Sequence, residues 1–127
     1  MLFFSTLFAT GAHIVCVSWA TLPKWHAYSI AAGLATSILN HGQLVRRGRT
    51  IDRIIVRAAY VIDVYSIVVQ PSCPAKKTFD ALILGLAGIS YVISKTFNND
   101  CLRKEWHVLS HLLATLAHIS MSRPALC

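Results

Sequence analysis

Two of the six histidines in this chain, His107 and His111, are four residues apart. In a helix this spacing places both imidazoles on one face, where they can bind one zinc ion. A third imidazole, from His41, would leave the fourth coordination position of the metal open for water. Zinc with three protein ligands and a bound water is the catalytic arrangement, because the metal lowers the pKa of that water toward neutrality. His41, His107 and His111 are therefore the candidate zinc ligands.

Two more residues near His41 have types suited to hydrolysis. Ser37 precedes it by four residues and Asp52 follows it by eleven. Asp52 is a candidate general base, or a group that orients a ligand histidine through its second nitrogen. Ser37 is a candidate hydrogen-bond donor to a ligand or to a developing oxyanion. The alternatives are that Asp52 pairs with Arg49 or Arg53 and that Ser37 is a small packing residue.

The elements that would position these residues are apolar stretches. Of 127 residues, 55% are hydrophobic and 13% are charged, and the mean hydropathy is +0.56. An average soluble domain has about 25% charged residues. A membrane-spanning helix needs about 20 apolar residues, and lipid leaves backbone groups no other partner short of a closed barrel. We predict an all-α, polytopic transmembrane bundle, a single domain over 1–127 with five spans at 2–22, 25–45, 51–70, 78–97 and 106–122.

The first stretch has an alternative interpretation as a cleaved signal peptide, because Ser18-Trp19-Ala20 resembles a small-x-small cleavage site. The basic region that precedes the apolar part of such peptides is missing. A retained helix is the favoured interpretation. The fourth stretch contains Gly85 and Gly88, a pair that permits close contact between helices.

Charges between the stretches predict an orientation. The formal net charge is +7, and the basic residues lie between apolar stretches, so we expect no nucleic-acid partner. If five spans alternate, one side receives most of the arginines, and the positive-inside rule makes that side cytoplasmic, with the amino terminus inside. The zinc candidates, Ser37 and Asp52 then share one depth in the cytoplasmic leaflet. The basic residues on that side are Arg46, Arg47, Arg49, Arg53, Arg57, Lys95, Arg103 and Lys104.

These residues also carry a family resemblance. Ser37-Ile-Leu-Asn-His41, followed by Asp52, resembles the S-x3-H-x10-D pattern of alkaline ceramidases, membrane hydrolases of a superfamily with adipoQ/progestin receptors and haemolysin III-type proteins. The phrase from Trp106 to His111 is similar to the closing helix of that family. The resemblance implies His41, His107 and His111 as zinc ligands and Ser37 and Asp52 as catalytic or supporting residues. It also implies a role in lipid metabolism, the hydrolysis of a lipid amide by zinc-bound water.

The chain departs from the family pattern in three places. Family members usually have seven spans, whereas five fit here. In the ceramidase form the histidine after the tryptophan is the second of its pair, which would put the first at Arg103. The acidic-Leu-Pro continuation after the aspartate is replaced by Arg53-Ile54-Ile55.

The sequence is also compatible with two other classes of function. The first is a haem-binding membrane anchor or electron carrier, with axial ligands from His41 and either His107 or His111, or from a second set on the opposite side. The second is a structural or assembly protein without chemistry. Asp63, near mid-membrane, would be neutral or paired with His13 or Tyr91, and as a proton relay it would indicate a transporter. The second set of histidines comprises His13, His26 and His118.

The expected partners are membrane lipids, including a lipid substrate, and a second copy of the chain in a homo-oligomer, because a small bundle with polar interior residues gains from self-association. No Gly-rich phosphate loop indicates a nucleotide site. Cys73 and Cys127 would share the non-cytoplasmic side as a candidate disulfide, Cys101 would be cytoplasmic, and Cys16 is expected to be a buried apolar residue.

Overall fold

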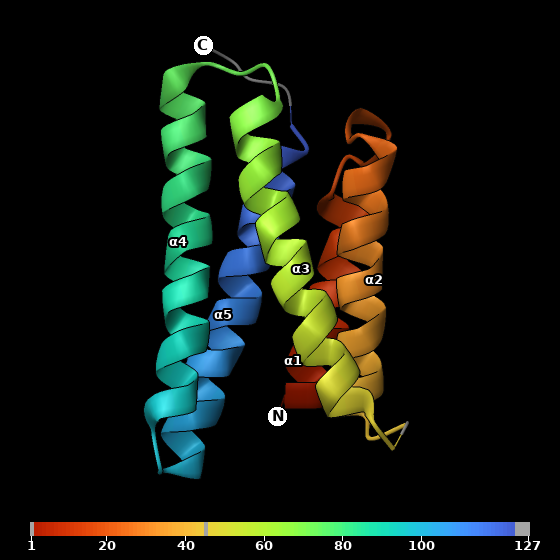
Figure 1. Ribbon diagram of the computed structural model, residues 1–127, viewed down its shortest axis with the longest axis vertical. Coiled ribbons are helices and arrows are strands. Elements are labelled where there is room, and N and C mark those ends of the chain that lie inside the picture. The colour runs from red at the N-terminus through yellow and green to blue at the C-terminus, as the bar shows by residue number, and fades with distance from the viewer. Residues whose placement is uncertain (1, 45, 124–127) are drawn as a thin grey trace.

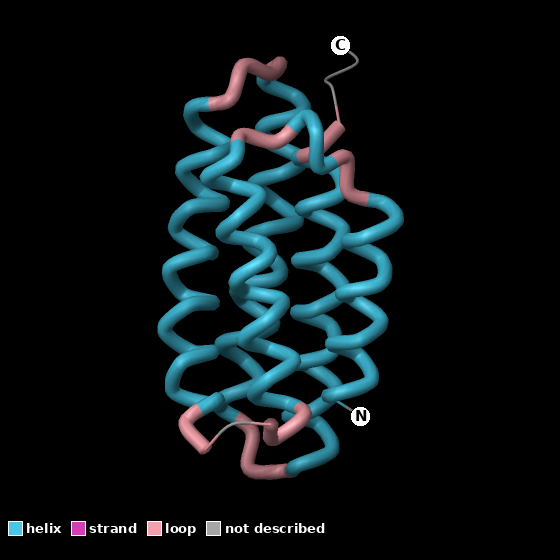
Figure 2. Tube along the Cα trace, turned by 90° about the vertical axis from the view of Figure 1, so that its right-hand side faces the viewer, coloured by secondary structure: helices cyan, strands magenta, loops and turns pink. Residues whose placement is uncertain are grey.

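The computed structural model describes residues 2–44 and 46–123, and in this part of the chain it contains five α-helices, one short 3-10 turn (η1) and no strand. The all-helical prediction is confirmed. The helices run antiparallel to their neighbours in sequence, with the connections at the two ends of the bundle (Figures 1 and 2). The elements are α1 Leu2–Cys16, η1 Trp19–Thr21, α2 Lys24–His41, α3 Gly48–Val69, α4 Pro74–Thr96 and α5 Asp100–Met121.

The five helices form a ring in which each contacts the next and α5 returns to contact α1. The α3–α4 contact is the smallest of the five. The axes of these two helices diverge from the loop that joins them toward the end where α3 begins (Figure 1). Where they meet, the Tyr60 hydroxyl donates to the Leu84 carbonyl oxygen at 3.2 Å. This arrangement leaves an interior space that all five helices can line.

The first helix covers only part of the stretch 2–22. It ends at Cys16 because the local hydrogen bonds change there. The carbonyl oxygen of His13 accepts the Val17 amide at 3.2 Å and the Trp19 indole N–H at 3.0 Å, while the Ser18 amide donates to Ser122 Oγ at 3.0 Å. The turn η1 follows and leads into α2.

Caps explain two boundaries near candidate site residues. Helix α5 begins at Asp100, before the expected 106, because Asn99 Oδ1 accepts the amides of Cys101 and Leu102 at 2.9 and 3.2 Å. Helix α2 ends at His41. Gln43 then adopts a positive φ of 54°, and its amide and that of Leu44 donate back to the last turn, a Schellman closure. The closure fixes the end of α2 that carries His41.

The distribution of side chains is the reverse of that in a protein with an apolar core. Among the described residues, 13 buried residues are polar or charged and 9 are hydrophobic, and many large apolar side chains are exposed. One described helix, α4, is long and apolar enough to cross a membrane, and α1 is apolar but shorter. Cys16 is half-buried and free, Cys101 is exposed and free, and Cys127 lies outside the described residues, so its pairing with Cys73 stays a prediction.

Candidate functional site

The three candidate zinc ligands lie together at the end of the bundle where α2 ends. His41 is the last residue of α2, and His107 and His111 come from the first half of α5. Their ring centroids are 5.2 Å (His41–His107), 5.4 Å (His41–His111) and 4.8 Å (His107–His111) apart. One nitrogen from each ring lies within 4.8 Å of the other two. The alternation of the helices, as expected, brings these residues from distant parts of the sequence to one place.

The nitrogens that would hold a metal lack partners in the described part of the chain. Nε2 of His41 is buried and has no hydrogen bond there. Neither ring nitrogen of His107 forms a hydrogen bond with another described residue. Buried polar atoms are nearly always paired, so an unpartnered imidazole nitrogen beside two others fits the role of a metal ligand. Zinc bound tetrahedrally to three imidazoles holds their nitrogens about 3.3 Å apart, so the cluster needs only a small contraction to fit the ion.

The third ring, His111, is oriented by α1. Its Nδ1 lies 3.1 Å from Ser5 Oγ, and Ser5 Oγ in turn donates to the Leu2 carbonyl oxygen at 2.9 Å. Because the serine hydroxyl has a single proton, which the carbonyl takes, His111 must donate its Nδ1–H to Ser5. Nε2 of His111 then keeps its lone pair. In this tautomer a histidine can bind a metal through Nε2.

Asp52 is held by three side chains of α2 and not by arginine. Its Oδ1 accepts from Ser37 Oγ at 2.8 Å and from Thr36 Oγ1 at 3.3 Å, and its Oδ2 accepts from Asn40 Nδ2 at 2.8 Å. No ion pair to Arg49 or Arg53 forms within the described residues. The structure therefore favours neither the arginine pairing nor a hydrogen bond from a histidine ring to Asp52. Ser37 serves as a donor to this carboxylate.

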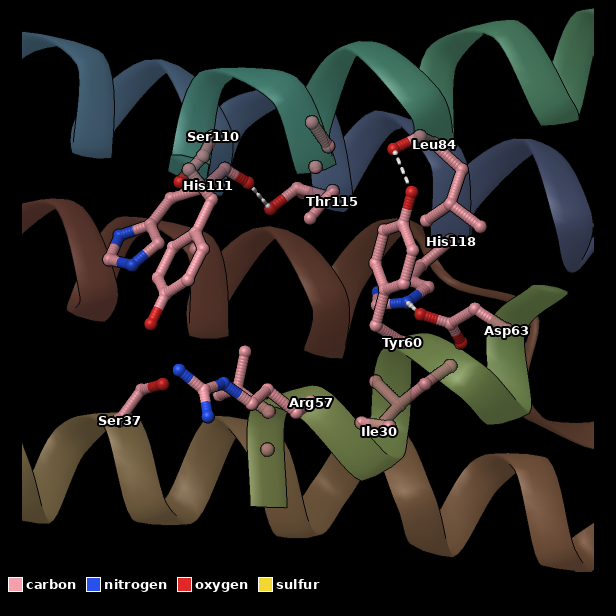
Figure 3. A pocket seen from close by; sticks show the side chains of 18 of the residues that line it. Ile30, Ser37, Arg57, Tyr60, Asp63, Leu84, Ser110, His111, Thr115 and His118 are labelled. Atoms are coloured by element: carbon pink, nitrogen blue, oxygen red, sulfur yellow. Dashed lines mark hydrogen bonds and ion pairs between the residues drawn. The ribbon is translucent and has the colours of Figure 1, made fainter. Parts of the chain in front are cut away.

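A cavity of about 1030 Å³ connects these groups. Ser37, Asp52, His107 and His111 line it together with apolar residues of all the long helices, as Figure 3 shows for Ser37 and His111. Such a volume lies at the upper end of the range for ligand sites. The cavity is thus a candidate substrate site with two residues of the histidine cluster, His107 and His111, in its wall.

Two cationic side chains also line this cavity. Arg57 and Lys95 have no ion pair with a described carboxylate. The Lys95 ammonium lies 4.7 Å from the centroid of the Tyr91 ring, and this ring lies 5.6 Å from that of His107. Lys95 is therefore close to the histidine cluster. Both cations can offset negative charge that arises in the cavity.

A second polar cluster lies farther along the bundle. Asp63 Oδ1 is 2.8 Å from His26 Nε2, and Asp63 Oδ2 is 2.9 Å from His118 Nε2, a contact drawn in Figure 3. His118 Nδ1 is 2.8 Å from His13 Nε2. Of the two partners expected for Asp63, Tyr91 forms no hydrogen bond with it in the described residues, and His13 is linked to it through His118. The direct partners of Asp63 are thus His26 and His118, two members of the second set of histidines.

Sequence reasoning missed three residues that support the site, namely Ser5, Thr36 and Asn40. Their only signal is a hydroxyl or amide in an apolar stretch at helical spacing from another polar residue, as with Thr36 and Asn40, which are four residues apart. No protein-family model, no curated protein and no solved structure matches the chain.

Proposed function

We propose that this chain is an integral membrane protein whose five helices form a multi-pass bundle with the amino terminus in the cytoplasm. The reversed side-chain distribution supports this proposal, because lipid is the solvent in which exposed apolar faces and a polar interior are both stable. Helices α2, α3 and α5 have 18, 22 and 22 residues, or about 27 to 33 Å at 1.5 Å per residue, close to the thickness of a bilayer core. Their mean hydropathy is low because their interior faces carry histidine, serine and aspartate, and because the first halves of α3 and α5 carry exposed charged residues such as Arg53 and Arg103.

Within this bundle we propose a zinc-dependent hydrolase that acts on a lipid amide. The observation that carries the proposal is the convergence of His41, His107 and His111, with the buried Nε2 of His41 unpartnered, beside a cavity that Asp52 and Ser37 also line. The same five residues form the motif through which the chain resembles alkaline ceramidases. A bound zinc ion would supply Lewis-acid activation of water and of the amide carbonyl.

The residues of the chain then have separate tasks. Asp52, held in place by Ser37 and Asn40, takes a proton from the attacking water and returns it to the leaving amine, so that no net proton is consumed in this exchange. Arg57 and Lys95 offset the negative charge that develops on the carbonyl oxygen. The apolar walls of the cavity take the hydrocarbon chains and exclude bulk water.

The histidine geometry favours a single ion over haem. Axial histidines must lie on opposite faces of a porphyrin, whereas the three rings here contact one another edge to face at 4.8 to 5.4 Å. A Soret band in the purified protein would contradict the zinc proposal.

The test is amide hydrolysis by the detergent-purified, zinc-loaded protein on a fluorescent N-acyl sphingosine. We expect turnover by the wild type, loss of turnover in His111→Ala, and unchanged turnover in Lys104→Gln, an exposed position on the same helix. Zinc bound in full without hydrolysis of this substrate or of simpler N-acyl amines would refute the hydrolase proposal.

A further inference from the structure

The second polar cluster forms a continuous chain of contacts across four helices. It begins at the Ala9 carbonyl oxygen, 2.6 Å from His13 Nδ1, and continues through His118 and Asp63 to His26. It ends at Ser66 Oγ, 3.0 Å from His26 Nδ1. The side chains come from α1, α5, α3 and α2, and no described lysine or arginine forms an ion pair with Asp63.

The protons in this chain can be counted from its fixed acceptors. A carbonyl oxygen only accepts, so His13 donates through Nδ1 and a neutral His13 accepts through Nε2. His118 must then donate its single Nδ1 proton to His13. This leaves no proton for the 2.9 Å contact between His118 Nε2 and Asp63 Oδ2. Neutral imidazoles and a carboxylate therefore fall one proton short, and the gap is filled either by an extra proton, on a ring or on Asp63 itself, or by a cation in its place.

We propose that the gap is filled by a divalent transition-metal ion such as Zn²⁺, bound by His26, Asp63 and His118. One donor atom from each lies within 4.8 Å of the others. With a metal ion in place, every ring needs only its ordinary single proton. His118 donates Nδ1–H to His13, and His26 donates Nδ1–H to Ser66. These are the outer hydrogen bonds that orient ligand histidines in metal sites.

Burial and access also fit a metal site. Asp63 is 4% exposed and His26 is fully buried, so an uncompensated carboxylate here would be costly. His13, Asp63 and His118 line the large cavity, which gives an ion a route to the donors. Two nitrogens and one carboxylate oxygen form a common donor set for zinc.

This site is separate from the three-histidine cluster. His111 and His118 are seven residues apart on α5, which corresponds to about 10 Å along the helix axis. Two metals that act on one reacting group lie about 3.5 to 4 Å apart. The second ion therefore has a structural task, to hold α2, α3 and α5 together, with His13 joining α1 to them.

The experiment is zinc stoichiometry by elemental analysis of purified, zinc-equilibrated protein, for the wild type, His41→Ala, Asp63→Asn and the double variant. We expect two, one, one and no equivalents. Asp80→Asn is the matched control, because Asp80 is also buried but contacts Lys76 and Ser120 in place of histidines, and we expect it to keep both equivalents. Loss of one equivalent only in Asp63→Asn would support this site and refute the three-histidine site.

A second measurement avoids variants, in case Asp63→Asn does not fold. In ¹⁵N NMR of the zinc-equilibrated wild type, we expect His118 and His26 to be neutral rings, each with its proton on Nδ1. A His118 ring with protons on both nitrogens, or a His26 ring with its proton on Nε2, would mean that a proton occupies the position, and either would overturn the metal proposal. A wild type that binds one equivalent, lost in His41→Ala and kept in Asp63→Asn, would overturn it as well.

Discussion

The hydroxyl of Ser5 lies 3.1 Å from Nδ1 of His111, a contact that joins residues 106 positions apart and links α1 to α5. It is the only described side-chain hydrogen bond to a ring of the three-histidine cluster. Because the Ser5 proton is used by the Leu2 carbonyl oxygen, the contact selects the tautomer of His111 that leaves Nε2 free for a metal. A residue of the first helix therefore helps to build a site whose ligands lie on α2 and α5.

Replacement of Ser5 by alanine removes this acceptor. We expect Ser5→Ala to weaken zinc binding at the three-histidine cluster by about 10- to 100-fold, the usual effect of losing an outer hydrogen bond to a ligand histidine. Competition with a chelator of known affinity measures the change. Ser5→Thr, which keeps the hydroxyl, is the control. Equal affinities for Ser5→Ala and wild type would show that Ser5 does not support the ligand.

Asp52 is predicted to act on protons and not to bind the metal. Asp52→Asn keeps an oxygen that can accept from Ser37 but has no basic carboxylate. We expect hydrolysis to fall by about 10²- to 10⁴-fold with zinc content unchanged. Parallel measurement of turnover and of bound zinc separates the two effects. If zinc is lost together with activity, Asp52 is a metal ligand or a folding residue, and the general-base assignment is wrong.

Gly88 and Gly85 provide a matched pair on α4. A Cβ at Gly88 would lie 2.7 Å from the Tyr60 hydroxyl oxygen and 3.0 Å from its Cζ, whereas a Cβ at Gly85 meets nothing within 4 Å. We expect Gly88→Ala to destabilise the α3–α4 contact by about 1 to 3 kcal/mol. Gly85→Ala should be neutral or stabilising, since alanine is the better helix former by about 1 kcal/mol. Thermal unfolding in detergent compares them, and equal shifts would contradict this packing.

The sequence was sufficient for the helical class and for the grouping of His41, His107 and His111, because both follow from apolar stretches of helical length that alternate in direction. It was not sufficient for the contacts of each side chain. The Asp63 carboxylate selects His26 and His118 over Tyr91 because the rotation of each helix about its axis is set by packing. The end of α1 at Cys16 likewise depends on Trp19 and Ser122, and Ser122, which lies 104 residues from its partner Ser18 in the sequence, leaves no local signal.

The most direct test of the central claim is the zinc content of the purified protein with and without His41→Ala. We predict that this change removes one full equivalent of zinc and abolishes amide hydrolysis. Lys104→Gln is expected to leave the zinc content and the rate of hydrolysis unchanged. Zinc content that is absent in the wild type, or unaffected by the loss of His41, would contradict the site and the function proposed from it.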